Sequence, residues 1–184
     1  MNAYWWAVLI ALIALVGGII YYFQSENGKR EWEIIVLKLP VIGTLARNIY
    51  ITRFAENFGS LLESGIPVVK SLTIVSDVIG NHVYHDIILQ ASERVKSGGN
   101  ISEVFLASPE VPSIVGQMIR IGEDTGTTSQ VLMSVSKFYN QEVEHMTKNL
   151  TSLIEPVLIV FLGIGVAILV VGVLLPIYNV AGQL

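Results

Sequence analysis

The chain has 184 residues, of which 52% are hydrophobic and only 14% are charged, a more apolar balance than a soluble domain of this length needs. Its formal net charge of -4 provides no basic surface, so we expect no nucleic-acid partner. The absence of cysteine excludes disulfide bonds and thiolate metal sites.

The first predicted element is an uncharged run over residues 3–23, long enough to cross a bilayer as a helix. A secretory signal peptide is the alternative, but the run has neither a basic start nor a suitable cleavage site, and aromatic residues at both ends match interfacial belts. Small residues fall on one helical face, where a second helix could approach closely, although alanine is common in apolar segments anyway. They are Ala3, Ala7, Ala11, Ala14 and Gly18.

Residues 24–46 are predicted to form a linker, and residues 47–152 a bundle of about six helices. Apolar side chains recur there at helical spacing between glycine and proline breaks, and no segment alternates as a strand would. One break is Gly65 followed by Pro67, where one helix is expected to end and the next to begin. Asn100 with Glu103 predicts a capping box for a short fourth helix.

Residues 153–178 are the second predicted membrane helix, because Val157 to Leu175 contains no charged residue. The fold class is therefore all-α, a membrane protein with two transmembrane helices flanking a cytoplasmic bundle. All eleven Lys and Arg residues lie between Lys29 and Lys148. By the positive-inside rule the middle region is cytoplasmic and both termini lie on the outer side of the membrane.

Three motifs resemble one protein family. The first, Arg53–Pro67, fits the pattern Arg-x-x-x-x-Phe followed by Leu-Leu-x-x-Gly-x-Pro. The second is a Gly-Glu-x-x-Gly turn at Gly122–Gly126, and the third combines Ile154–Pro156 with Pro176. Over residues 39–178 the chain is similar to the F family of type II secretion systems, the GspF and PilC platform proteins, and it looks like their C-terminal half.

The resemblance implies a multi-pass protein of the bacterial inner membrane, in a type IV pilus or type II secretion machine. Such a protein would couple a cytoplasmic hexameric ATPase to the extraction and polymerisation of pilin or pseudopilin subunits. Other implied partners are membrane lipid, further inner-membrane assembly proteins and additional copies of the chain. Family members usually carry two helical domains and three spans, whereas one domain and two spans are predicted here.

Acidic residues of the motifs are the candidate partner contacts. Glu123 and Asp124 are expected to be exposed on a tight turn, where solvation alone would also explain them. Glu155 lies at the mouth of the last span, where a carboxylate needs water, a headgroup or a partner, unless it simply begins a helix before Pro156. The other motif residues are assigned structural roles: Arg53, Phe54, Phe58, Gly65, Pro67, Gly122, Gly126, Pro156 and Pro176.

Residues for catalysis are not evident in the sequence. It contains no phosphate-binding loop and no nucleophile elbow, so we expect no enzyme activity and no cofactor. His82 and His85 lie one helical turn apart beside Asp86, but surface histidines explain them better than a metal site does. The competing function is a two-span receptor or transporter subunit with a cytoplasmic partner-binding domain, which the nearly nonpolar spans disfavour.

Overall fold

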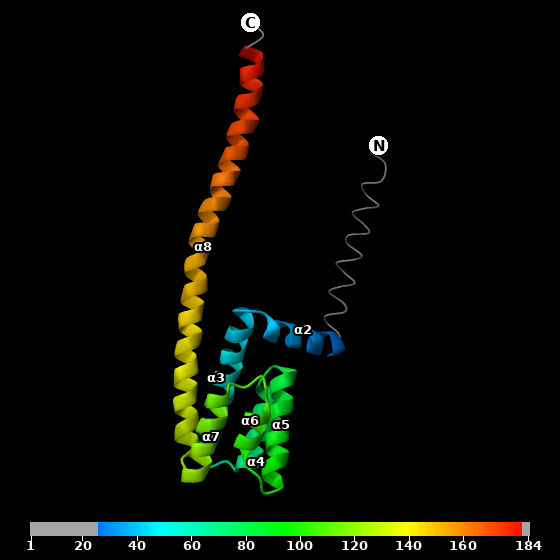
Figure 1. The fold of residues 1–184 in the computed structure, drawn as a ribbon, viewed down its shortest axis with the longest axis vertical. Coiled ribbons are helices and arrows are strands. Elements are labelled where there is room, and N and C mark those ends of the chain that lie inside the picture. Colours follow the sequence, from blue (N-terminus) through cyan, green and yellow to red (C-terminus); the bar gives the residue numbers. More distant parts are fainter. Residues whose placement is uncertain (1–25, 182–184) are drawn as a thin grey trace. The chain divides into compact units, whose positions relative to one another are not determined.

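The computed structural model describes residues 26–181, and every regular element in that range is an α-helix, as predicted. Contacts divide the chain into two units, one ending at Glu142 and one beginning at Val143. The predicted span at residues 3–23, with its small-residue face, lies outside the described residues. In chain order the helices of Figure 1 are α2 (Glu26–Lys38), α3 (Ile42–Glu63), α4 (Val68–Val78), α5 (His82–Lys96), α6 (Ile101–Ala107), α7 (Ser113–Thr125) and α8 (Thr128–Ala181).

One apolar core lies among the six helices from α3 to the first turns of α8. The Phe54 ring lies 5.4 Å from that of Phe58 and 4.7 Å from that of Phe105, measured between centroids. Both motif phenylalanines are therefore core residues, as their helical spacing suggested. Other fully buried members are Ile51, Ala55, Leu72, Val75, Ile79, Tyr84, Ile88, Ala91, Ile101, Val115, Ile119, Leu132 and Val135.

Glycines end three of these helices by the same geometry. At the end of α3, Gly65 has a φ of +77°, and the amides of Gly65 and Ile66 donate to carbonyls of the preceding turn at 2.9 and 3.0 Å. This is the Schellman arrangement, which glycine adopts without a steric penalty. Pro67 then immediately precedes α4. The ends of α5 and α7 are built in the same way around Gly98 and Gly126.

Helix α2 occupies most of the segment that the sequence predicted as a linker. It contacts α5 through charged side chains: Arg30 Nη2 lies 2.6 Å from Asp86 Oδ2, and Glu33 accepts a 2.7 Å hydrogen bond from the backbone N–H of His82. Leu37, on the same face of α2, is buried in the core. Because the inward face is mostly charged, the usual apolar stripe of a helix packed on a bundle is missing from the sequence.

A sharp corner separates α2 from α3, whose axes differ by 112°. The Ile42 amide donates to the Pro40 carbonyl at 2.8 Å, forming a γ-turn in which Val41 has φ 68° and ψ -61°. This conformation is rare and strained for a β-branched residue and costs on the order of 1–3 kcal/mol. Helix α3 supplies core side chains after the corner and is therefore a helix of the bundle.

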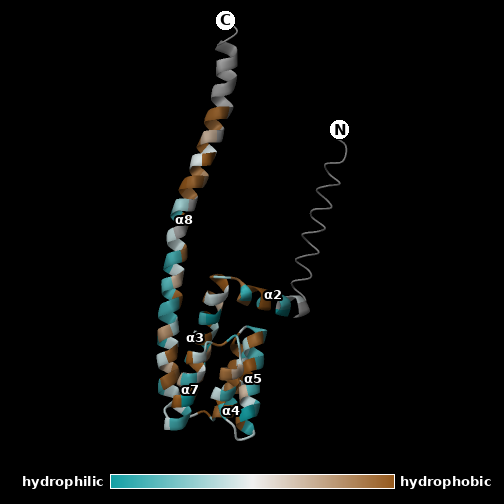
Figure 2. Cartoon of the chain, in the orientation of Figure 1, coloured by the Kyte–Doolittle hydropathy of each residue, from teal (hydrophilic) through white to brown (hydrophobic). Residues whose placement is uncertain are grey.

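Helix α8 contains the second predicted span. Its first turns belong to the bundle, where Leu132 and Val135 are buried. Within residues 26–181 it is the one continuous helix long and apolar enough to cross a membrane, and none of its apolar window is buried in protein. Figure 2 shows these apolar residues, in brown, along the later part of the helix. One of the two predicted spans therefore has a matching helix in the described residues.

A partly buried polar cluster ties several bundle segments together. The hydroxyl of Tyr84, a side chain only 1% exposed, donates to the Glu110 carbonyl at 2.9 Å. Arg47 Nη2 lies 3.1 Å from the Glu110 carboxylate and donates to the Leu37 carbonyl at 3.0 Å. Burial raises the pKa of the Tyr84 phenol above its usual value of about 10. The cluster therefore favours the neutral phenol and joins α2, α3, α5 and the loop before α7.

The Tyr84→Phe variant tests this cluster. At pH 8 we expect a loss of about 1 kcal/mol in the free energy of unfolding, because one partly buried hydrogen bond is removed. The folded protein holds the phenol proton above pH 10 while the unfolded chain releases it, so this stabilisation is complete below about pH 10 and declines above it. Urea unfolding in detergent at pH 8 and pH 11 should show a smaller alkaline loss for the variant. An equal loss in both proteins would contradict the assignment.

Candidate partner-contact site

The Gly-Glu-Asp-Thr-Gly motif is predicted as a tight turn between helices, but its first four residues form the last turn of α7 and only Gly126 lies beyond the helix. Its two glycines have different roles. Gly122 is buried where the helices approach each other: an added Cβ would lie 2.9 Å from Thr128 Cα and 3.3 Å from Val131 Cβ. A larger residue would therefore push α7 away from α8. Gly126 has a φ of +70°, and the amide of Thr127 donates to the Gly122 carbonyl at 2.9 Å. The motif is thus a close helix contact followed by a left-handed helix end.

Glu123 points inward from this turn. Its Oε1 accepts a hydrogen bond from the backbone N–H of Ile101 at 2.6 Å, and its Oε2 accepts one from Ser102 at 3.1 Å. Both amides belong to the first turn of α6, where backbone N–H groups lack helical partners and a negative charge is favoured. The side chain is half-buried, so the expectation of an exposed acid is wrong for this residue. Glu123 joins α7 to α6.

The predicted capping box of α6 is not formed. Asn100 occupies the N-cap position, but its side chain makes no capping hydrogen bond. The Glu103 carboxylate instead accepts from Arg94 Nε at 2.7 Å on the surface of α5. A carboxylate from a distant part of the chain, Glu123, replaces the local cap, and the short-range pattern could not reveal this.

Asp124, the next residue, has the opposite orientation. Its side chain is exposed, and it forms no hydrogen bond or ion pair with any residue in the described range. Neighbouring positions on a helix point about 100° apart, so one acid can face the bundle while the other faces solvent. Of the two acids in the turn, Asp124 is the one available to a partner.

Glu155 and Pro156 lie in the second unit, inside α8. Both side chains are exposed, and Glu155 forms no ion pair with another described residue. The interpretation of Glu155 as a helix-start residue is wrong, since α8 begins at Thr128 and continues through both Pro156 and Pro176. Glu155 therefore presents a carboxylate at the beginning of the apolar segment without the benefit of a helix terminus.

Arg53, the first residue of the first motif, is exposed on α3. Its guanidinium lies near Gly80, where an added Cβ would be 3.7 Å from Nη1. Within residues 26–181, no hydrogen bond or ion pair links Arg53, Asp124 and Glu155 to one another.

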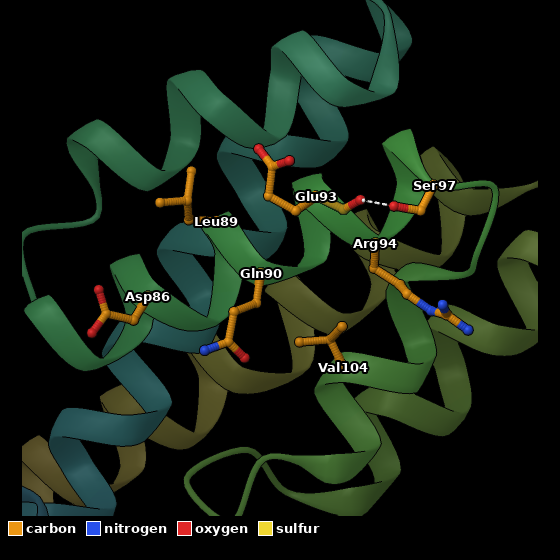
Figure 3. Close-up of a pocket in the computed structure, with 7 residues that line it drawn as sticks. All are labelled: Asp86, Leu89, Gln90, Glu93, Arg94, Ser97 and Val104. Carbon is orange, nitrogen blue, oxygen red and sulfur yellow. Dashed lines mark hydrogen bonds between the residues drawn. The ribbon is translucent and has the colours of Figure 1, made fainter.

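The hollow in Figure 3 has a volume of about 490 Å³ and lies between α5 and α6. Its charges are already paired: Arg94 contacts Glu103 at 2.7 Å, and Glu93 contacts Lys96 at 2.6 Å. In Figure 3, Arg94 points away from the other residues shown, so the polar groups do not converge on one point. No cluster of three metal-ligating residues occurs in the part of the chain that the structure describes. The lining residues are Asp86, Leu89, Gln90, Glu93, Arg94, Ser97 and Val104.

Comparison with known proteins decides the family. Residues 54–176 match the family model described as "Type II secretion system (T2SS), protein F", so the match includes the core phenylalanines, the α7–α8 turn and Glu155. The chain belongs to the type II secretion system protein F family. Proteins of the F family are structural components of the inner membrane and not enzymes, and the membership implied by the three motifs is confirmed.

Individual relatives of this F-family chain come from both kinds of machine. It is 32% identical over 183 residues to "Type IV pilus assembly protein PilC" of Myxococcus xanthus, covering 100% of this chain and 44% of that protein. The PilC protein of Thermus thermophilus is 34% identical over 96% of this chain and 44% of its own length. "Type II secretion system protein F" of Pseudomonas aeruginosa is 28% identical, at 95% and 44% coverage. The chain thus spans less than half the length of these relatives.

Proposed function

We propose that this chain acts in the inner-membrane platform of a type IV pilus or type II secretion machine, where it couples a cytoplasmic ATPase to the extraction and polymerisation of pilin-like subunits. The observation that carries the proposal is the F-family match over residues 54–176. Relatives named for pilus assembly and for type II secretion support a function shared by the two machines. Oligomers of the chain and contacts with other inner-membrane assembly proteins belong to the same proposal.

Helix α8 suggests how such coupling would work. The same helix supplies the buried residues Leu132 and Val135 to the bundle and, further along, contains the apolar segment after Glu155. Because one continuous helix supplies both, a displacement of the bundle would act directly on the segment in the membrane. The proposed topology, with a cytoplasmic middle region and both termini on the outer side, lets an ATPase reach the bundle.

The proposed contacts are the exposed carboxylates. Asp124 is available to a cytoplasmic partner because it has no described partner within the chain. Glu155 is exposed at the start of the apolar segment, where a membrane-embedded or interfacial partner would relieve the cost of its charge. Glu123 is left out of the contact set because its carboxylate caps α6.

Co-purification from the native membrane tests the function. An affinity-tagged full chain is expected to recover an assembly ATPase and pilin-like subunits, whereas an unrelated tagged membrane protein in the same host should recover neither. Deleting the gene should also abolish surface pili or secretion, and the wild-type gene should restore them. Normal pili and normal secretion in the deletion strain would contradict the proposal.

A further inference from the structure

Helix α2 has its polar and apolar faces reversed relative to an ordinary surface helix. Three residues of α2 face the bundle: Arg30 and Glu33, which bind Asp86 and His82 of α5, and one apolar residue, the buried Leu37. The opposite face carries Trp32 and Ile35, three positions apart and 50% and 48% exposed. Leu39 follows directly after the end of the helix and is 40% exposed. A helix in water normally turns its apolar stripe inward. Figure 2 shows the mixture of apolar and polar residues along α2.

The apolar surface continues around the corner into α3. Val41 and Ile42 are 53% and 52% exposed, although they follow directly after Leu39 and Pro40. Val41 also holds the strained γ-turn geometry, which a glycine would adopt freely. The β-branched side chain of Val41 makes the turn less stable and adds apolar area to the exposed surface of the protein. We call Trp32, Ile35, Leu39, Val41 and Ile42 together the corner face.

We infer that the corner face rests in the interfacial layer of the membrane, so that α2 lies along the lipid surface. The inference uses the membrane anchoring contained in the proposed function. Only Gln24 and Ser25 separate the predicted span at residues 3–23 from α2, a distance of at most about 11 Å along the chain from Phe23 to Glu26. The start of α2 therefore lies within reach of the bilayer surface, and a helix that continues along that surface would bring the corner face to it.

The composition of the corner face also favours lipid. Tryptophan is enriched at the headgroup level, and aliphatic side chains can enter the acyl boundary from a helix that lies in the interface plane. Lys38, exposed beside Ile35 and Leu39, can remain at the headgroups while its stem covers apolar surface. On the other side of α2, Arg30 and Glu33 are bound to Asp86 and His82 of α5. These contacts remain intact when the corner face lies on lipid.

Single-cysteine labelling of the full chain in lipid vesicles tests the inference, and the natural sequence has no cysteine to remove. The variant Ile35→Cys, labelled with a polarity-sensitive fluorophore, should be quenched by lipids carrying doxyl groups and protected from aqueous iodide. The matched control is Ile121→Cys, which replaces an isoleucine 58% exposed near the end of α7. Helix α3 begins at the corner, and Gly59 near its other end packs on Met133 in the first turns of α8. Ile121 precedes α8 closely in the chain, so the control lies at the end of the bundle away from the corner.

The outcomes separate the possible coverings of the corner face. Lipid quenching at residue 35 but not at residue 121 supports the inference. Iodide quenching at residue 35 would overturn it, and protection from both quenchers would also overturn it because a protein surface would then cover the face. A third label at Leu12→Cys reports the predicted first span. Lipid quenching at residue 12 but not at residue 35 would refute the interfacial position of α2 and leave the membrane anchor intact. No lipid quenching at residue 12 or at residue 35 would refute both the interfacial helix and the anchor.

Discussion

Replacing Glu123 with glutamine is expected to lower the free energy of unfolding by about 1.5–3 kcal/mol, the range for hydrogen bonds to a charged group. The carboxylate accepts from the amides of Ile101 and Ser102, at 2.6 and 3.1 Å. The amide of a glutamine has only one oxygen acceptor, so its NH2 group would face one of these N–H groups. The loss of charge also removes a favourable interaction with the start of α6.

Thermal and urea unfolding of the full chain in detergent measures this effect. The matched control is Glu103→Gln, the same chemical change on α6, where the carboxylate pairs with Arg94 on the surface and both side chains are about half exposed. Exposed ion pairs contribute little, so the control should lose less than about 1 kcal/mol. Equal stability of the two variants would show that the Glu123 cap is energetically unimportant.

Replacing Asp124 with lysine is expected to abolish pilus assembly or secretion while the stability of the protein changes by no more than about 0.5 kcal/mol. The side chain is exposed and has no described partner in the chain, so the fold does not depend on it. At the proposed contact, a cation in place of the carboxylate would lose the ion pair and add repulsion. Piliation or secretion in a complemented deletion strain provides the measurement, with protein abundance checked in the same cells.

Two further variants define the Asp124 contact. Asp124→Glu keeps the charge and should retain most of the function. Asp77→Lys makes the same charge reversal at another exposed acid, at the end of α4, and should leave assembly intact. Normal assembly by Asp124→Lys would refute the contact role. Changing both acids of the turn together would be uninformative, because the loss of the Glu123 cap could by itself explain a loss of function.

The helical architecture follows from local signals in the sequence. Gly65 ends α3 in the left-handed conformation and Pro67 precedes α4, at the break that the sequence predicts. Backbone geometry of this kind depends on a few neighbouring residues, so a pattern can reveal it. The core positions Phe54 and Phe58 follow from helical spacing for the same reason.

The features that the sequence did not reveal depend on distant residues. Glu123 caps a helix that begins 22 positions earlier, so its inward orientation depends on how α6 and α7 pack. The segment of α2 is predicted as a linker, whereas in the structure its charged residues Arg30 and Glu33 bind Asp86 and His82 of the distant helix α5. The strained turn at Val41 breaks the usual preference of β-branched residues and has no local signature.

The adjacency of Glu123 and Asp124 has a mechanical consequence. A partner that binds the exposed carboxylate of Asp124 would exert force one residue away from Glu123, whose carboxylate accepts hydrogen bonds from the first two amides of α6. Such a force would be expected to weaken the hydrogen bonds of Glu123 to Ile101 and Ser102 before it affected the buried core. Faster hydrogen–deuterium exchange at these two amides when the partner is bound would measure this local opening.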